Sequence, residues 1–189
     1  MITFQAKYLS PVNIGKINDK KNIVPYKAAI VELNPNDIKD SFSLNLVSYF
    51  SLKKKRFADS IFEDFLDTTD GKVNNRNWVK YIALTKEQDS YKYIKSRNIL
   101  GLAEISSAPL FKDCIYLDYL QTVKKRFFNK YCFVGRETLE FLKKMYPDMD
   151  IVLRSLTSAV KFYKNNGFYV AEEGKKDGLI KMRYHHINI

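Results

Sequence analysis

The sequence predicts one α+β domain built on a mixed, mostly antiparallel sheet. Its 189 residues, 46% of them hydrophobic, are enough for one core and too few for two ordinary domains. Three consecutive apolar segments between residues 78 and 122 favour an antiparallel meander. A helical segment between the fourth and fifth expected strands favours a parallel crossover at that point.

The first third of the chain combines strands with a helical segment. Residues 2–8 alternate loosely and residues 24–33 are apolar after the turn-like residues 18–22, so we expect one strand or two here. From residue 37 to 66 apolar side chains recur at helical spacing, which predicts two short helices or one broken helix. Residues 67–77 are polar and predict a loop.

The middle of the chain changes to the pattern of extended strands. Residues 78–84, 98–106 and 114–122 are each apolar, rich in Tyr, Ile and Leu, and bounded by polar or proline-containing stretches. Because the three segments are consecutive, we expect neighbouring antiparallel strands. A basic and aromatic loop follows at residues 123–133.

The last third alternates helices and strands. Residues 135–146 place Leu139, Leu142 and Met145 on one helical face, and Pro147 ends that helix. The remaining expected elements are a strand at 150–153, a helix at 157–165, and strands at 168–172 and 179–184. The second helix stops at an Asn-Asn-Gly sequence, whose residues reach the left-handed conformation at low cost.

The chain carries a strong positive charge. Thirty-two Lys and Arg stand against 21 Asp and Glu, a formal net charge of +11 at pH 7. This charge favours polyanionic partners such as RNA, the ribosome or a phosphate-rich cofactor, with a solvated basic surface as the alternative. Basic clusters lie at residues 53–56 and 124–128, and the second also contains two phenylalanines. Such a mixture suits single-stranded nucleic acid, although a surface loop with both rings packed inward is the simpler interpretation.

Cysteine and histidine usage favours a reducing compartment and predicts no metal site. Cys114 and Cys132 lie in apolar or aromatic surroundings, which is typical of buried free thiols and predicts a cytoplasmic location. His185 and His186 lie near the C-terminal end, and no ligand spacing indicates a metal ion. No apolar run approaches the roughly 18 residues of a membrane span, and the first residues lack an export signal. We therefore expect neither membrane insertion nor export.

The end of the second helix carries the residues of a known family. Ala159, Phe162, Tyr163, Gly167 and Phe168 have the spacing A-x-x-F-Y-x-x-x-G-F. This stretch resembles a motif of the GNAT superfamily of acyl-CoA-dependent N-acetyltransferases, and the order of elements fits that family best over residues 78–184. The resemblance implies a GNAT-like central sheet flanked by helices on both faces, in a single domain over residues 1–189.

The resemblance also implies catalytic roles. In the family the tyrosine of this motif approaches the thioester sulfur as general acid, which is Tyr163 here, and a tyrosine with a packed ring is the alternative. Because adjacent helical residues point about 100° apart, we expect Phe162 in the core and Tyr163 facing the cleft. Many members hold a base on the central strand where this chain has Asp118, and Glu104 on the preceding strand is the second candidate. For Asp118 the alternative is a solvent-facing member of the strand alternation.

Two further segments resemble the family's cofactor site. The central strand of the family pairs with the pantetheine arm of acyl-CoA, at positions that match Leu120, Gln121 and Thr122. The pyrophosphate loop, usually Q/R-x-x-G-x-G/A at the start of a helix, is most similar here to residues 130–135. The cofactor-binding residues implied for this loop are Lys130, Phe133, Val134, Gly135 and Arg136. Phe133 replaces the first glycine and narrows the conformations that point several amides at one phosphate, while the basic side chains supply charge.

Together these likenesses imply an N-acetyltransferase that moves an acetyl group from acetyl-CoA to a primary amine by direct attack, without a cysteine nucleophile. The acceptor is open among a protein, an aminoacyl-tRNA and a small amine, and the charge favours an RNA or ribosomal partner. The oligomeric state, monomer or homodimer, is open as well. The alternative is a GNAT-fold module that binds nucleic acid or protein without catalysis.

Overall fold

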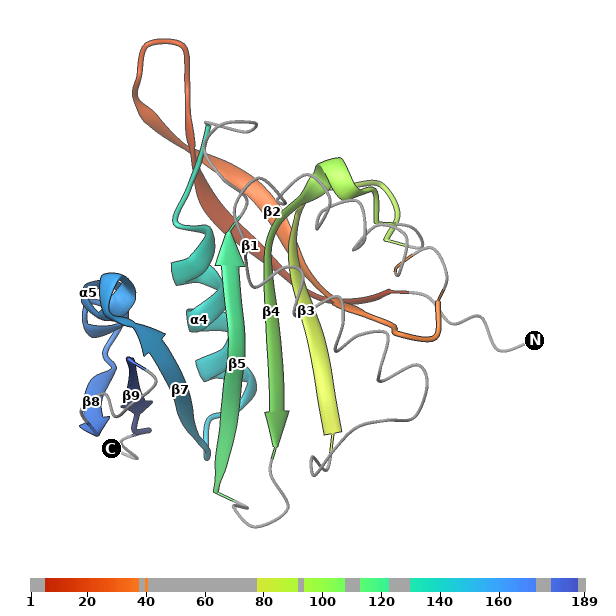
Figure 1. The fold of residues 1–189 in the computed structure, drawn as a ribbon. Helices are drawn as coiled ribbons and strands as arrows, with labels where there is room; N and C mark the ends of the chain where they lie inside the picture. Colours follow the sequence, from red (N-terminus) through yellow and green to blue (C-terminus); the bar gives the residue numbers. More distant parts are fainter. Residues whose placement is uncertain are drawn as a thin grey trace.

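The computed structural model describes residues 6–37, 40, 78–91, 94–107, 113–122, 130–172 and 178–186. Within these ranges nine strands form one sheet in the order β6-β1-β2-β3-β4-β5-β7-β9-β8 (Figure 1). In this described part β5 and β7 are parallel, and the other neighbouring pairs are antiparallel. The prediction of a mixed, mostly antiparallel sheet is confirmed.

From residue 78 onward the elements follow the expected order apart from β6, a two-residue strand that falls in the loop expected at residues 123–133. The strands are β1 (Lys7–Ile17), β2 (Ile23–Leu33), β3 (Trp78–Lys86), β4 (Ile99–Ser107), β5 (Cys114–Thr122), β6 (Tyr131–Cys132), β7 (Asp150–Leu156), β8 (Tyr169–Glu172) and β9 (Leu179–Tyr184). The helices are α4 (Val134–Met145) and α5 (Val160–Lys164), with 3-10 turns η1 (Ser96–Asn98) and η2 (Thr157–Ala159). Neither described α-helix is long and apolar enough to cross a lipid bilayer.

Several sequence predictions fall on residues that the structure does not describe. They are the helical segment at 37–66, apart from residues 37 and 40, the loop at 67–77, and the basic clusters at 53–56 and 124–128. The two α-helices within the described ranges, α4 and α5, contribute to the same core cluster on one face of the sheet.

The N-terminal hairpin is longer than the sequence pattern predicts. β1 begins at Lys7, near the end of the segment expected at residues 2–8, and pairs with β2 around the turn at residues 18–22. Pro11 lies inside the strand, where its missing N–H would interrupt a central ladder. β1 tolerates it because its outer edge is paired with β6 at Gly15 and Lys16, away from the proline.

The sheet buries apolar side chains on both of its faces. One face packs against α4, where Leu139 and Leu142 join Ile82 of β3, and all three are fully buried. The neighbouring Tyr81 belongs to a second buried cluster, because successive residues of a strand point to opposite faces. Leu139 and Leu142 of the apolar stripe predicted for residues 135–146 thus lie on the face of α4 that packs on the sheet, whereas Met145, the third predicted member, is only partly buried.

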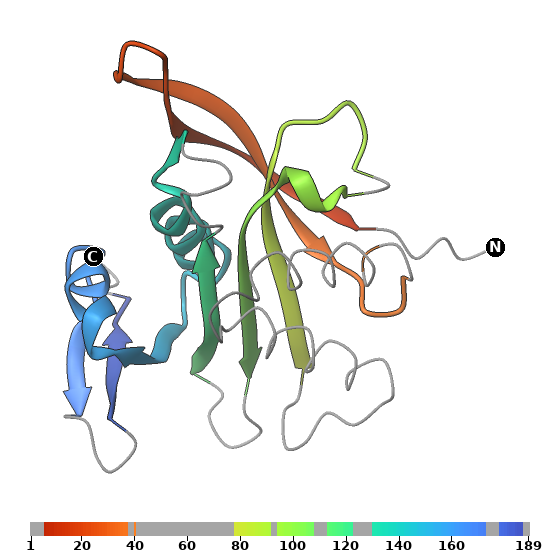
Figure 2. The same ribbon diagram turned by 45° about the horizontal axis from the view of Figure 1, so that its top comes forward.

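β5 and β7 separate as they run. Their parallel ladder covers residues 114–117 of β5 and residues 150–153 of β7. β5 continues to Thr122 while paired with β4, and β7 continues to Leu156 while paired with β9. Figures 1 and 2 show β7 leaning away from β5 toward α5. The two strands therefore diverge at the carboxyl end of β5.

Candidate functional site

The start of α4 lies beside Thr122, the last residue of β5. An ideal Cβ built on Gly135 would lie 3.6 Å from the Thr122 Cγ2 atom. The first backbone hydrogen bond of α4 runs from the Glu137 N–H to the Phe133 carbonyl at 2.9 Å. The N–H groups of residues 134–136 precede that bond and have no partner within the helix. Together with the helix dipole, they favour an anion at this point.

Phe133 adopts a left-handed backbone at the N-cap of α4, with φ 67° and ψ 7°. This conformation costs a residue with a Cβ about 1 kcal/mol relative to glycine, and it occurs where the family's loop has its first glycine. The Phe133 ring is 45% exposed and packs on Gly15 of β1, whose ideal Cβ would lie 3.0 Å from the ring. No local sequence pattern marks Gly15, because its contact with Phe133 arises only when β1 pairs with β6.

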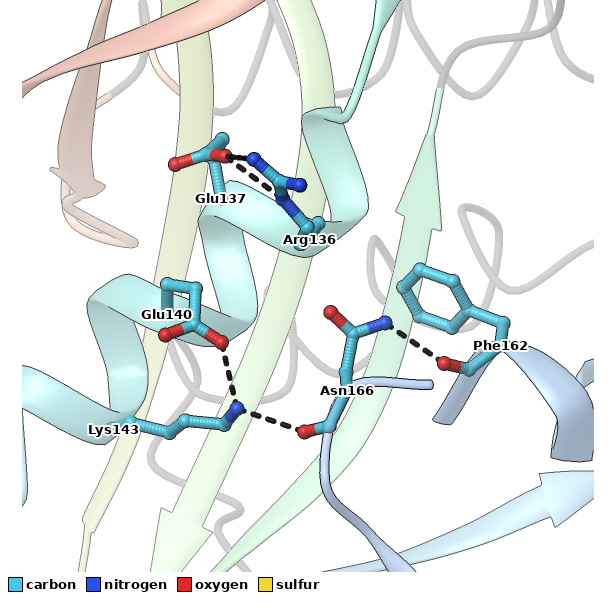
Figure 3. A network of polar contacts seen from close by, with 6 residues as sticks. All are labelled: Arg136, Glu137, Glu140, Lys143, Phe162 and Asn166. Carbon is cyan, nitrogen blue, oxygen red and sulfur yellow. Dashed lines mark hydrogen bonds and ion pairs between the residues drawn. The ribbon is translucent and has the colours of Figure 1, made fainter. Parts of the chain in front are cut away.

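The two basic side chains expected at the phosphate site point in different directions. The Arg136 guanidinium lies 4.8 Å from the centre of the Phe133 ring and pairs with Glu137 at 2.8 Å (Figure 3). Arg136 thus stays at the start of α4. Lys130 donates from Nζ to Asp19 at 2.9 Å, in the turn between β1 and β2. The structure therefore directs the Lys130 ammonium to the hairpin turn.

The orientation expected for the two aromatic residues of α5 is wrong. Tyr163 is 9% exposed and belongs to the core that packs on α4, whereas Phe162 is 36% exposed. Helical spacing sets the angle between adjacent side chains but not which of them faces the sheet. α5 has five residues and follows a 3-10 turn, so packing sets its rotation. The Tyr163 ring makes edge contacts with Phe162 and Phe168, at centroid distances of 5.1 and 5.6 Å.

Phe162 nevertheless lies at the start of α4, and the Tyr163 ring packs against it. An ideal Cβ on Gly135 would lie 3.1 Å from the Phe162 Cζ atom, so the Phe162 ring covers one side of the start of α4. Burial raises the pKa of Tyr163 to about 12, which keeps its phenol protonated at neutral pH.

The two candidate bases differ in accessibility. Glu104 pairs with Tyr119, but the next residue of β4 pairs with Leu117, which makes Asp118 the extra residue of a β-bulge. The Asp118 carboxylate accepts a hydrogen bond from the Ser106 hydroxyl at 2.5 Å and is partly exposed. Glu104 is 0% exposed. Of the two carboxylates, Asp118 is the one within reach of a solvated amine.

The three cofactor-binding residues expected on the central strand lie beyond the ladder with β7. Leu120, Gln121 and Thr122 pair with Ala103, Leu102 and Gly101 of β4 on one side. Their other side faces the divergence, because the ladder between β5 and β7 stops at Leu117. This stretch of β5 leads directly to the start of α4.

A second polar cluster ties β9 to the amino end of β7. The buried Asp150 carboxylate accepts hydrogen bonds from Arg183 at 2.5 Å, from the His186 N–H at 3.3 Å, and lies 2.8 Å from His185 Nδ1. Burial by itself raises the pKa of Asp150, but the hydrogen bonds from Arg183, His186 and His185 outweigh it and hold the pKa below its usual value. Across the described ranges, no group of three or more His, Cys, Asp or Glu side chains could hold a metal ion.

The fold matches solved structures of N-acetyltransferases. An aminoglycoside 6'-N-acetyltransferase complexed with coenzyme A superposes with a TM-score of 0.54 and 14% identity, covering 85% of this chain and 98% of that one. The ribosomal-protein-S18-alanine N-acetyltransferase from Escherichia coli has a TM-score of 0.51 and 13% identity, covering 83% and 92%. The PaiA N-acetyltransferase from Thermoplasma acidophilum, in complex with coenzyme A, has a TM-score of 0.50 and 15% identity, covering 83% and 98%.

These likenesses define the class of the molecule, which is a protein with the GNAT fold. No family model and no curated protein matches the sequence. At 13–15% identity the superpositions establish the fold, and the activity has to be argued from the site.

Proposed function

We propose that this chain is an acyl-CoA-dependent N-acetyltransferase of the GNAT superfamily that acts on a primary amine. The observation that carries the proposal is the divergence of β5 from β7 beside the start of α4, where the Phe162 ring of α5 lies against Gly135 and the Tyr163 ring contacts Phe162. The structural neighbours crystallised with coenzyme A support the same class of cofactor.

The residues at this divergence fit acetyl-CoA by their chemistry. The N–H groups of residues 134–136 suit the pyrophosphate, and Arg136 adds a positive charge beside them. The edge of β5 at residues 120–122 suits the amide groups of the pantetheine arm, because both are extended hydrogen-bonding chains. When bound there, acetyl-CoA supplies an activated acyl group as a thioester.

The side chains at the site can then be assigned roles. Asp118 accepts a proton from the ammonium form of the acceptor, directly or through water. A backbone N–H of β5 stabilises negative charge on the acyl oxygen. Tyr163, with a pKa of about 12, donates a hydrogen bond from Oη to the departing sulfur. Full proton transfer to a thiolate with a conjugate-acid pKa near 8.5 would cost about 5 kcal/mol in the free enzyme, so we assign the hydrogen bond as the main contribution. As the new C–N bond forms and the C–S bond breaks, coenzyme A would leave as the thiolate and the second proton of the amine nitrogen would pass to solvent.

The acceptor is proposed to belong to an anionic partner, such as RNA or a ribosomal complex, in the cytoplasm. The net charge of +11 supports this class. Burial lowers the pKa of Lys86, and the positive charges of Arg97 and Lys16, which lie on other elements, lower it further. A phosphate-bearing partner would relieve the repulsion among them.

A calorimetric or dye-based thermal shift tests cofactor binding directly. Coenzyme A at 100 times its dissociation constant should stabilise the fold by about 2.7 kcal/mol, which for a chain of this size raises the melting temperature by about 5–10 °C. Acetyl-CoA turnover is then followed by thiol release with a panel of amines, ribosomal proteins and aminoacyl-tRNA. Cofactor binding without thiol release from any acceptor class would contradict the catalytic part of the proposal.

One observation favours a second candidate function, a binding module without catalysis. Tyr163 is buried and the Phe162 ring covers one side of Gly135, so the cofactor must fit beside two packed aromatic rings. Under this alternative, millimolar coenzyme A leaves the melting temperature unchanged, while RNA is retained in a salt-sensitive manner.

A further inference from the structure

Lys143 of α4 reaches across to the turn that ends α5 (Figure 3). Its Nζ donates to the Asn166 carbonyl at 2.8 Å and to Glu140 Oε1 at 2.7 Å. It also lies 4.5 Å from the centre of the Tyr184 ring of β9. The Lys143 side chain is only 11% exposed. An ammonium has three N–H donors. Two of them are used in these hydrogen bonds, and the positive charge also faces the Tyr184 ring.

Asn166 extends this link to the backbone of α5. Its Nδ2 donates to the Phe162 carbonyl at 2.8 Å, as Figure 3 shows, and its N–H donates to the Tyr163 carbonyl at 2.9 Å. Asn166 is itself 9% exposed. A continuous series of hydrogen bonds therefore joins Lys143 to the two peptide groups that carry the aromatic residues of the site.

α5 depends on such contacts for its position. It has five residues, fewer than the roughly 12 that an isolated helix needs to be even marginally stable in water. It follows β7 after that strand has left β5, so the sheet ladder does not hold it beside the divergence. Packing of the Tyr163 and Phe168 rings fixes which side of α5 faces inward. The Lys143 link fixes α5 to α4, the helix whose start is the proposed phosphate site.

We propose that Lys143 is a positioning residue, which through Asn166 holds the backbone of α5, and with it Tyr163, in a fixed position relative to α4. This inference rests on the proposed acetyltransferase function. Lys143 touches no reacting group, and it acts through Asn166 and the backbone of α5. A purely structural role would instead change stability while leaving turnover per folded molecule unchanged.

The first test compares two neighbouring lysines. Lys143→Met removes the donors and keeps most of the side-chain length, and Lys144→Met is its control because Lys144 is exposed one residue further on. In the folded fraction we expect Lys143→Met to lower kcat about tenfold while the Kd for coenzyme A changes by less than twofold. The control should leave both values unchanged. Lys143→Gln, which keeps a donor for the Asn166 carbonyl, should recover part of the loss, and it replaces Lys143→Met if that variant does not fold.

The second test is a double-mutant cycle with Tyr163→Phe. If Lys143 acts through the phenol, Lys143→Met should have almost no further effect on kcat once the hydroxyl is gone. A full tenfold loss in both backgrounds would overturn the inference, because the two residues would then act independently. Asn166→Ala, which breaks the same series of hydrogen bonds one step later, should behave like Lys143→Met in both backgrounds.

A structural measurement separates failure of this inference from failure of the proposed function. Hydrogen exchange at the amides of residues 166–168 and the NMR shifts of the Tyr163 ring report the position of α5 without any turnover. Both should change in Lys143→Met and stay the same in Lys144→Met. If they change although the parent protein shows no acetyltransferase activity, the proposed function fails while the link from Lys143 to α5 stands. If they do not change, the inference about Lys143 is wrong whatever the activity.

Discussion

Replacing Gly101 of β4 with alanine should weaken the contact between the sheet and the start of α4. An ideal Cβ at Gly101 would lie 2.7 Å from Val134 Cγ1 and 3.4 Å from the Gln121 carbonyl oxygen. Val134 is 6% exposed, so its methyl group has no room to turn toward solvent. Overpacking of this kind costs about 1–3 kcal/mol. We expect a loss near the middle of that range, about 2 kcal/mol, which lowers the melting temperature by about 4–8 °C in a chain of this length.

Urea unfolding followed by circular dichroism measures this loss, and Val134→Ala supplies the control. Val134→Ala alone should cost about 2 kcal/mol, because it empties a buried site. In the double variant the new methyl at residue 101 occupies part of that space, so the two losses should fall short of their sum by about 1 kcal/mol or more. Because Val134 begins α4, coenzyme A should also bind more weakly to Gly101→Ala. An unfolding free energy within 0.5 kcal/mol of the parent, or strictly additive losses, would refute the steric argument.

Three further predictions concern charge and protonation. Asp150→Asn should lower the unfolding free energy by about 2 kcal/mol at pH 7. Because the folded pKa of Asp150 lies below its unfolded value, this difference between parent and variant should persist above about pH 4 and shrink as pH falls further. A difference that stays constant down to pH 2 would argue against the ion pairs. Arg136→Gln should weaken coenzyme A binding about three- to tenfold and reduce its salt dependence, whereas Lys130→Gln, whose ammonium is directed to Asp19, should not; equal effects would reject the different placements of the two cations. Tyr163→Phe should lower kcat with coenzyme A affinity intact, and the parent should lose no activity through Tyr163 ionisation up to about pH 10; a loss between pH 8 and 10 that disappears in Tyr163→Phe would contradict its burial.

Regular elements with a strong local pattern were predictable from the sequence. The expected strand at residues 114–122 and the strand at 179–184 match β5 and β9, and the helix expected at 135–146 is α4 within one residue at each end. Each pattern is the repeat of apolar side chains within one element, every three to four residues in a helix and every second residue in a strand, so it is a local property of the sequence. Most of β1 lies outside the strand expected at residues 2–8, because Pro11 weakens the strand pattern that follows. Whether a strand tolerates a proline depends on which neighbouring strands pair with it at that residue, and this is a tertiary property.

The sequence by itself determined the identity of the motif residues, the charge of the chain and, apart from β6, the order of the elements from residue 78 onward. Only the tertiary structure decided that Tyr163 is buried while Phe162 is exposed, that Lys130 pairs with Asp19, and that Gly15 makes room for the Phe133 ring. Each of these depends on residues far apart in the chain, brought together by strand pairing and by the packing of α5 against α4. A sequence pattern specifies which side chains share a face of an element, but the rotation of a five-residue helix is set by the surfaces that it packs against.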